Sequence, residues 1–142
     1  MLSPVDDKLA VLRRVPLFAD LDERSLEAIG VLMQERDVPA GHILMLEGEP
    51  GDTFVVIVEG TIRIERGAEQ ARSMSAGGFI GEIALIERGV RTATATCVTD
   101  CRLLELKRHE FERLLTAFPH LERRLRTAIL RRPHGQGGSI GG

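Results

Sequence analysis

The sequence of 142 residues contains neither tryptophan nor tyrosine, and phenylalanine occurs five times. It also lacks a long apolar run. The longest run of apolar residues with branched or aromatic side chains, Phe54 to Val58, is far shorter than the roughly 20 residues that span a bilayer. The N-terminus has no signal-peptide pattern. We therefore expect a soluble domain with a cytoplasmic location.

Cysteine and histidine are scarce, and neither charge dominates. The two cysteines, Cys97 and Cys101, lie in apparent strand sequence without metal-type partners, so we expect reduced thiols. The four histidines are scattered without paired spacing, and the sequence contains no HExxH, P-loop or nucleophile elbow. The formal net charge of −2 gives no global attraction to nucleic acid or anionic lipid. These absences predict a non-enzyme with no catalytic residues, no metal site and no direct DNA binding.

Helical patterns occur at both ends of the chain, whose length fits one domain. Ser3 and Pro4 predict a helix start, and Asp22 can cap a second helix, so residues 1–33 are expected to be N-terminal helices. Apolar residues recur at helical spacing after position 108, which predicts C-terminal lid helices over 108–132. The tail, 133–142, has too little apolar surface to offset its ordering entropy and is expected to be disordered.

Short β-rich runs separated by glycine, proline and aspartate fill residues 34–107, a texture typical of a β sandwich or barrel. Polar and apolar residues alternate over 61–65 and again over 104–107. Glu59 and Gly60 stand between two such runs, and we expect a tight hairpin there. The middle of the chain is therefore predicted to be a β-barrel.

The stretch Phe79 to Ala95 carries the residues suited to binding an anion. Gly81 lets backbone amides approach a phosphate closely, and Arg91 offers a planar fork that matches two phosphate oxygens. Glu82 can accept a hydrogen bond from a ribose hydroxyl. From Thr92 onward, threonines alternate with small residues, so one strand face leaves room for a ligand. This pattern favours a sensor over a catalyst.

Several motifs together resemble the cyclic-nucleotide-binding domain family of catabolite-activator-type regulators, kinase regulatory subunits and nucleotide-gated channels. The resemblance covers about Leu17 to Arg132. Its motifs are PLF at Pro16 to Phe18, GEPGD at Gly48 to Asp52, VEG at Val58 to Gly60, FIGE at Phe79 to Glu82 and RTA at Arg91 to Ala93. It implies a mainly β fold, an eight-stranded jelly-roll β-barrel (double-stranded β-helix) with flanking N- and C-terminal α-helices. Residues 79–93 would form its phosphate-binding cassette.

The resemblance also implies a role for each site residue. Glu82 would hold the ribose 2'-hydroxyl, and Arg91 would pair with the cyclic phosphate. Thr92 would hydrogen-bond to phosphate or base, and Ile64 resembles the apolar position beneath the purine. Close backbone contacts are expected from Gly81, Ile83 and Ala84, and the ligand-binding set also includes Phe79 and Ala93.

Two departures from the family pattern concern the base. Val55 stands where many members have tyrosine, and no tyrosine or tryptophan is present to stack on the base from the last helix. A guanidinium from Arg131 or Arg132 is the alternative cap. The other arginines of that helix are expected to form a solvated face.

The leading hypothesis is a regulatory sensor domain that binds a cyclic nucleotide, cAMP in preference to cGMP, and converts binding into movement of the C-terminal helix. The hydroxyl of Thr92 leaves cGMP as an alternative ligand. The alternatives are a ligand-free interaction domain on the same barrel, or a regulatory fragment of a larger channel, transporter or enzyme. The presence of Glu82 and Arg91 argues against the ligand-free domain, and the alternative for these two residues is a structural ion pair on a surface loop. The effector protein and homodimerisation are left open.

Overall fold

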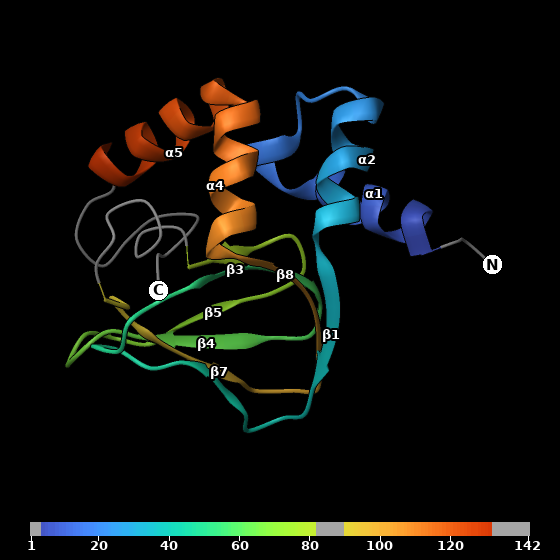
Figure 1. Cartoon of the computed structure of the whole chain (residues 1–142). Helices are drawn as coiled ribbons and strands as arrows, with labels where there is room; N and C mark the ends of the chain where they lie inside the picture. The colour runs from blue at the N-terminus through green and yellow to red at the C-terminus, as the bar shows by residue number, and fades with distance from the viewer. Residues whose placement is uncertain (1–3, 82–89, 132–142) are drawn as a thin grey trace.

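Helices flank a central set of strands at both ends of the chain (Figure 1). The computed structural model describes residues 4–81 and 90–131. Within them the helices are α1 (Pro4–Arg14), the 3-10 turn η1 (Pro16–Phe18), α2 (Glu23–Leu32), α4 (Arg108–Ala117) and α5 (Pro119–Arg131). In Figure 1, α4 stands over β3 and β8, with α1 and α2 to one side of it. None of these helices has the length and apolar character needed to cross a membrane.

The strands form two four-stranded antiparallel sheets, ordered β1-β8-β3-β6 and β2-β7-β4-β5. The mainly β, jelly-roll class with flanking helices is therefore confirmed. No ladder between named strands joins the two sheets in the part of the chain described, so they form a sandwich and not a closed barrel. The strands are β1 (Gln34–Val38), β2 (Ile43–Met45), β3 (Thr53–Glu59), β4 (Ile62–Glu65), β5 (Arg72–Met74), β6 (Phe79–Ile80), β7 (Thr94–Cys97) and β8 (Cys101–Lys107).

Strand β3 is apolar on both faces because it lies between two hydrophobic clusters. Phe54 and Val56 pack with the helices on one side of the sheet. Val55 and Ile57 point the other way, into the space between the two sheets. Such a run buried on both faces needs cover on each side, which the helices and the second sheet supply.

The hairpin predicted at Glu59 and Gly60 is wrong. Strand β3 pairs with β6 and β8, whereas β4 pairs with β5 and β7. Gly60, at φ +102°, therefore carries the chain from one sheet to the other. A Cβ there would lie 2.6 Å from the Asp100 carbonyl oxygen, so this crossing requires glycine.

The helix starts follow the predicted chemistry. Asp22 caps α2, because its Oδ1 accepts a hydrogen bond from the Ser25 amide at 2.8 Å. That side-chain contact with Ser25 lowers the pKa of the Asp22 carboxyl. The predicted first helix is present over Pro4–Arg14, while Ser3 and the tail at 133–142 lie outside the described residues.

Both cysteines are buried with free thiols. They lie at the ends of β7 and β8 that face each other across the connecting turn. Burial and, secondarily, the Cys101 thiol raise the pKa of Cys97 to about 12. Cys97 therefore stays a protonated thiol at neutral pH.

We expect Phe54 to be the most costly side chain to truncate in the helix-facing cluster. Its ring lies 5.0 Å from that of Phe111, 5.7 Å from that of Phe79 and 6.5 Å from that of Phe18, centroid to centroid. Phe54→Ala should lower the free energy of unfolding in urea by about 3–5 kcal/mol. The control is Val31→Ala, at a side chain that is 76% exposed, which should change it by less than about 0.5 kcal/mol. Equal losses from the two variants would contradict the packing described.

Candidate functional site

Arg91 is the one buried charged side chain among the residues that the structure describes, with 5% of it exposed. Three oxygens of the described residues accept hydrogen bonds from its guanidinium. Nη2 donates to the carbonyl oxygen of Thr53 at 3.0 Å and to its Oγ1 at 2.9 Å, and Nη1 donates to the Gly81 carbonyl oxygen at 3.3 Å. Burying a charge is costly unless hydrogen bonds compensate it, so these acceptors fix the guanidinium in one place.

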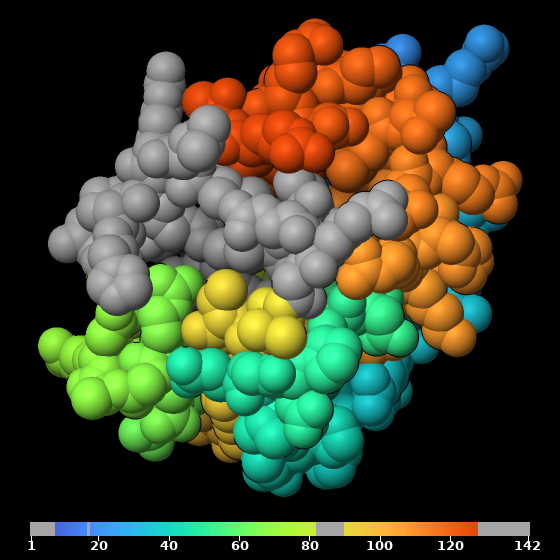
Figure 2. Space-filling model, turned by 60° about the vertical axis from the view of Figure 1, so that its left-hand side comes forward, coloured from blue at the N-terminus to red at the C-terminus, as the bar shows by residue number. Residues whose placement is uncertain are grey.

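The backbone around Arg91 is held by the loop that precedes β3. The Arg91 amide donates to the Glu49 carbonyl oxygen at 2.7 Å, and the Gly48 amide donates to the Arg91 carbonyl oxygen at 2.9 Å. An isolated antiparallel bridge joins Pro50 to Val90. Figure 2 shows the yellow segment that follows residue 89 lying between the blue-green segment before β3 and the light-green segment after β4. The GEPGD motif therefore serves to position Arg91.

Gly81 brings β6 close to both Thr53 and Arg91. Its φ is +100°, a conformation that L side chains rarely adopt. A Cβ on Gly81 would overlap the Thr53 carbonyl oxygen and lie 2.9 Å from Nη1 of Arg91. Gly81 therefore brings the backbone close to Thr53 and Arg91, while its predicted approach to a phosphate stays a prediction.

Thr92 contacts a second arginine. Its Oγ1 accepts a hydrogen bond from Nη2 of Arg66 at 3.5 Å, a long bond. Arg66 directly follows β4 in the chain. The segment at 91–92 thus carries the guanidinium of Arg91 and contacts a second guanidinium, that of Arg66, through Thr92.

The strand after Thr92 presents its small residues inward, as predicted. Ala93, Ala95 and Cys97 are at most 1% exposed and lie in the cluster between the sheets. Ile64, at 3% exposed, pairs with Ala95 in the β4–β7 ladder. The predicted purine platform and the small-residue strand are therefore neighbours inside the sandwich.

Phe79 has a different environment from the other predicted contacts. Its ring packs against Phe54 in the helix-facing cluster, whereas the next residue, Ile80, lies in the cluster between the sheets. The side chain of Phe79 is thus a neighbour of the helices. The predicted contact of Phe79 with a ligand stays a prediction.

The remaining predicted site residues are not placed by the structure. Glu82, Ile83 and Ala84 lie outside the described residues, and so does Arg132. The backbone of Arg131 ends α5, but its side chain is not described. The roles assigned to these residues stay predictions.

Two site residues were missed by sequence reasoning, Thr53 and Arg66. Thr53 offers two acceptors to Arg91, and nothing in its local pattern announces a partner 38 positions away. Arg66 had a signal, since Ile62 and Ile64 face inward and residues two apart share a face of a strand. This alternation was not applied to Arg66 because a charged residue is ordinarily expected to face solvent.

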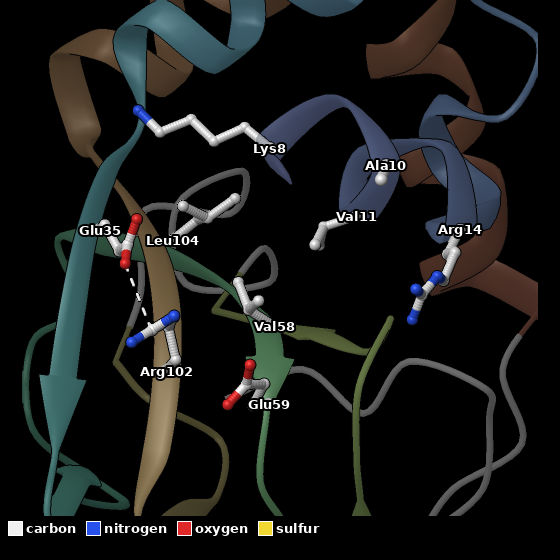
Figure 3. A pocket seen from close by; sticks show the side chains of 9 residues that line it. All are labelled: Lys8, Ala10, Val11, Arg14, Glu35, Val58, Glu59, Arg102 and Leu104. Atoms are coloured by element: carbon white, nitrogen blue, oxygen red, sulfur yellow. Dashed lines mark ion pairs between the residues drawn. The ribbon is translucent and has the colours of Figure 1, made fainter. Parts of the chain in front are cut away.

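A separate hollow of about 310 Å³ lies beneath α1, against β1, β3 and β8 (Figure 3). Three of the charged residues that line it have partners in the fold: Lys8 donates to the carbonyl oxygens of Gly30 and Met33, and Arg102 pairs with Glu35 at 3.3 Å. None of the predicted site residues lines it. In the described part of the chain, no three His, Cys, Asp or Glu side chains gather closely enough to hold a metal.

Comparison with known proteins decides the family. The family model described as a cyclic nucleotide-binding domain matches residues 35–118, which include every described site residue. The chain belongs to the cyclic nucleotide-binding domain family. The resemblance drawn from the motifs is thereby confirmed, and by family this is a cyclic nucleotide-binding regulatory domain.

Similar proteins come from several regulatory settings. The chain is 35% identical over 121 residues to a cyclic nucleotide-gated potassium channel of Rhizobium etli, covering 85% of this chain and 34% of the channel. It is 28% identical over 127 residues to the CRP-like cAMP-activated global transcriptional regulator of Mycobacterium tuberculosis, covering 86% of this chain and 57% of the regulator. The cAMP-bound PfPKA-R structure superposes with a TM-score of 0.80 at 26% identity, covering 89% of this chain and 44% of that one. The chain therefore spans well under two thirds of the length of these proteins.

Gly81→Ala should destabilise this cyclic nucleotide-binding domain more than Gly48→Ala does. Both glycines border Arg91 and both have positive φ, +100° and +89°, so both substitutions incur backbone strain. Only at Gly81 would the new Cβ overlap protein atoms, since nothing lies within 4 Å of a Cβ at Gly48. We expect an extra loss of about 1–3 kcal/mol in the free energy of unfolding for Gly81→Ala. Similar losses for both variants would mean that the close approach to Thr53 and Arg91 is not required.

Proposed function

We propose that this domain binds a 3',5'-cyclic nucleotide, cAMP in preference to cGMP, with the cyclic phosphate at Arg91. The observation that carries the proposal is the buried Arg91 guanidinium, fixed at the close approach of Gly81 and Thr53 within the segment that matches the family. A planar fork of fixed charge in a pre-organised position suits a phosphate that carries one negative charge. The preference for cAMP is supported by the relatives and structures named for cAMP.

The other predicted contacts complete the proposed site. Glu82 would accept from the ribose 2'-hydroxyl, and Gly81, Ile83 and Ala84 would present backbone groups to the ligand. Ile64 and Ala93 would form the apolar floor, and Thr92 would hydrogen-bond to the phosphate or base. Phe79 would support β6 from the helix side.

We propose a regulatory output, not catalysis, because a short chain of contacts joins Arg91 to α4. Thr53, which accepts two bonds from Arg91, pairs with Lys107 at the end of β8. The adjacent Arg108 amide donates to the Asp52 carbonyl oxygen at 2.7 Å, and Nη2 of Arg108 donates to the Gly51 carbonyl oxygen. A ligand that reorients Arg91 would therefore act on the first turn of α4.

The far end of the helical segment is also tied to the fold. Arg124 on α5 donates from Nη1 and Nη2 to the two carboxylate oxygens of Asp20, at 3.0 and 2.6 Å. The hydrogen bond from Arg124 lowers the pKa of Asp20. This exposed pair is screened by water and is worth little, so it can open when α5 moves.

Arg91→Ala should weaken cAMP binding about a hundredfold, since a charge-assisted bond contributes about 1.5–3 kcal/mol. Arg91→Lys should also bind poorly, because the charge remains but the fork is lost. Isothermal titration calorimetry of ligand-stripped protein measures both, with cGMP as a second ligand expected to bind less tightly. Urea unfolding without nucleotide separates lost binding from lost folding.

The proposal would be contradicted if folded wild-type protein gave no heat of binding with millimolar cAMP or cGMP. Such a protein would not be a cyclic nucleotide sensor. The ligand-free interaction domain would then be the better account of this fold.

Binding of cAMP should change hydrogen exchange in α4 and α5, because the contacts at Asp52 and Gly51 connect the site to that segment. Arg108→Ala should reduce this change, whereas Arg113→Ala, at an exposed position on the same helix, should leave it as in the wild type. Mass spectrometry of peptides covering 108–131 provides the measurement. Exchange there that is the same with and without bound cAMP would contradict the proposed output.

A further inference from the structure

Arg66 directly follows β4, and by the alternation of the strand it lies on the same face as the buried residues of β4. Ile62 and Ile64 are 0% and 3% exposed, and Arg66 is the next residue on that face. Its Nη2 reaches Thr92, on the neighbouring segment after residue 90. Its backbone is held in a turn, since its carbonyl oxygen accepts from the Glu69 amide at 2.9 Å and the next amide, Gly67, donates to Oε1 of Glu47 at 2.8 Å.

The guanidinium of Arg66 obtains little compensation for its partial burial. Nε is shielded from solvent and has no hydrogen-bond partner among the described residues. The hydrogen bond from Nη2 is long, 3.5 Å to a neutral hydroxyl. A partly buried guanidinium whose Nε is shielded and unpartnered is unfavourable in the protein alone, and an anion at that place would stabilise it.

The contact with Thr92 suggests which anion this could be. Arg66 contacts the residue that directly follows Arg91 in the chain, so its guanidinium lies next to the segment proposed to bind the cyclic phosphate. A cyclic phosphodiester carries one charge and has two exocyclic oxygens. Each oxygen can accept from a separate guanidinium.

We infer that Arg66 is a second arginine of the phosphate site and donates to one exocyclic oxygen of the cyclic nucleotide, while Arg91 donates to the other. The inference rests on the proposed function, because it assigns a further residue to the same ligand. It also gives Thr92 a role in the ligand-free protein, where its hydroxyl accepts a hydrogen bond from Arg66.

The test compares Arg66→Ala and Arg66→Lys with Arg63→Ala as the matched control. Arg63 lies on the exposed face of the same strand and forms a long ion pair with Glu65 at 3.7 Å. Each protein is titrated calorimetrically with cAMP and with its two phosphorothioate diastereomers, in which sulfur replaces one or the other exocyclic oxygen. Sulfur is a poorer acceptor than oxygen, so each diastereomer weakens one guanidinium contact.

Arg66→Ala should weaken cAMP binding about tenfold or more, and Arg66→Lys should weaken it less, while Arg63→Ala should stay within about twofold of the wild type. Arg66→Ala should also change the ratio of affinities for the two diastereomers, because Arg66 contacts only one of the two oxygens. Without nucleotide, its unfolding midpoint should not fall, since a poorly compensated cation has been removed.

Unchanged cAMP affinity in Arg66→Ala would overturn the inference and leave the proposed function intact. Equal weakening of both diastereomers, with a lower unfolding midpoint, would make Arg66 a structural residue and also overturn it. If the wild type bound no cyclic nucleotide, the proposed function would fail, and this inference with it.

Discussion

The burial of one guanidinium group constrains much of this fold. Arg91 can be enclosed only if oxygen acceptors meet it, and Thr53 and Gly81 supply them from two paired strands of one sheet. Gly81 must lack a side chain for its backbone to come so close, and the loop at 48–50 must fold over to hold the Arg91 backbone. The family motifs around these positions are thus parts of one arrangement that presents a fixed positive charge.

Strand β3 connects that arrangement to the rest of the domain. Its first residue, Thr53, binds Arg91, and the next, Phe54, packs against rings from both helical segments. Val55 and Ile57 belong to the cluster between the sheets. Because these side chains share one backbone, a shift of Thr53 would be felt in the site, in the sandwich interior and in the packing beneath α4. The proposed anion site and the helices that are proposed to move are therefore joined by one strand.

Local chemistry was predictable from the sequence, and long-range pairing was not. Asp22 as a cap and the inward face of Ala93 and Ala95 each follow from a few neighbouring residues. The hairpin expected at Gly60 was wrong because β3 is apolar on both faces, and its partner β8 lies more than 40 residues on. Arg66 continues the alternation of β4, but no prediction was made for it, and only the folded structure shows its Nε buried. Glu82, Ile83 and Ala84 stay predictions.

The most direct test of the central claim is a crystal structure of this domain with bound cAMP. The account predicts the cyclic phosphate within hydrogen-bonding distance of the Arg91 guanidinium and close to the backbone at Gly81. Nucleotide bound elsewhere, such as in the hollow beneath α1, with no contact between its phosphate and Arg91, would contradict this claim.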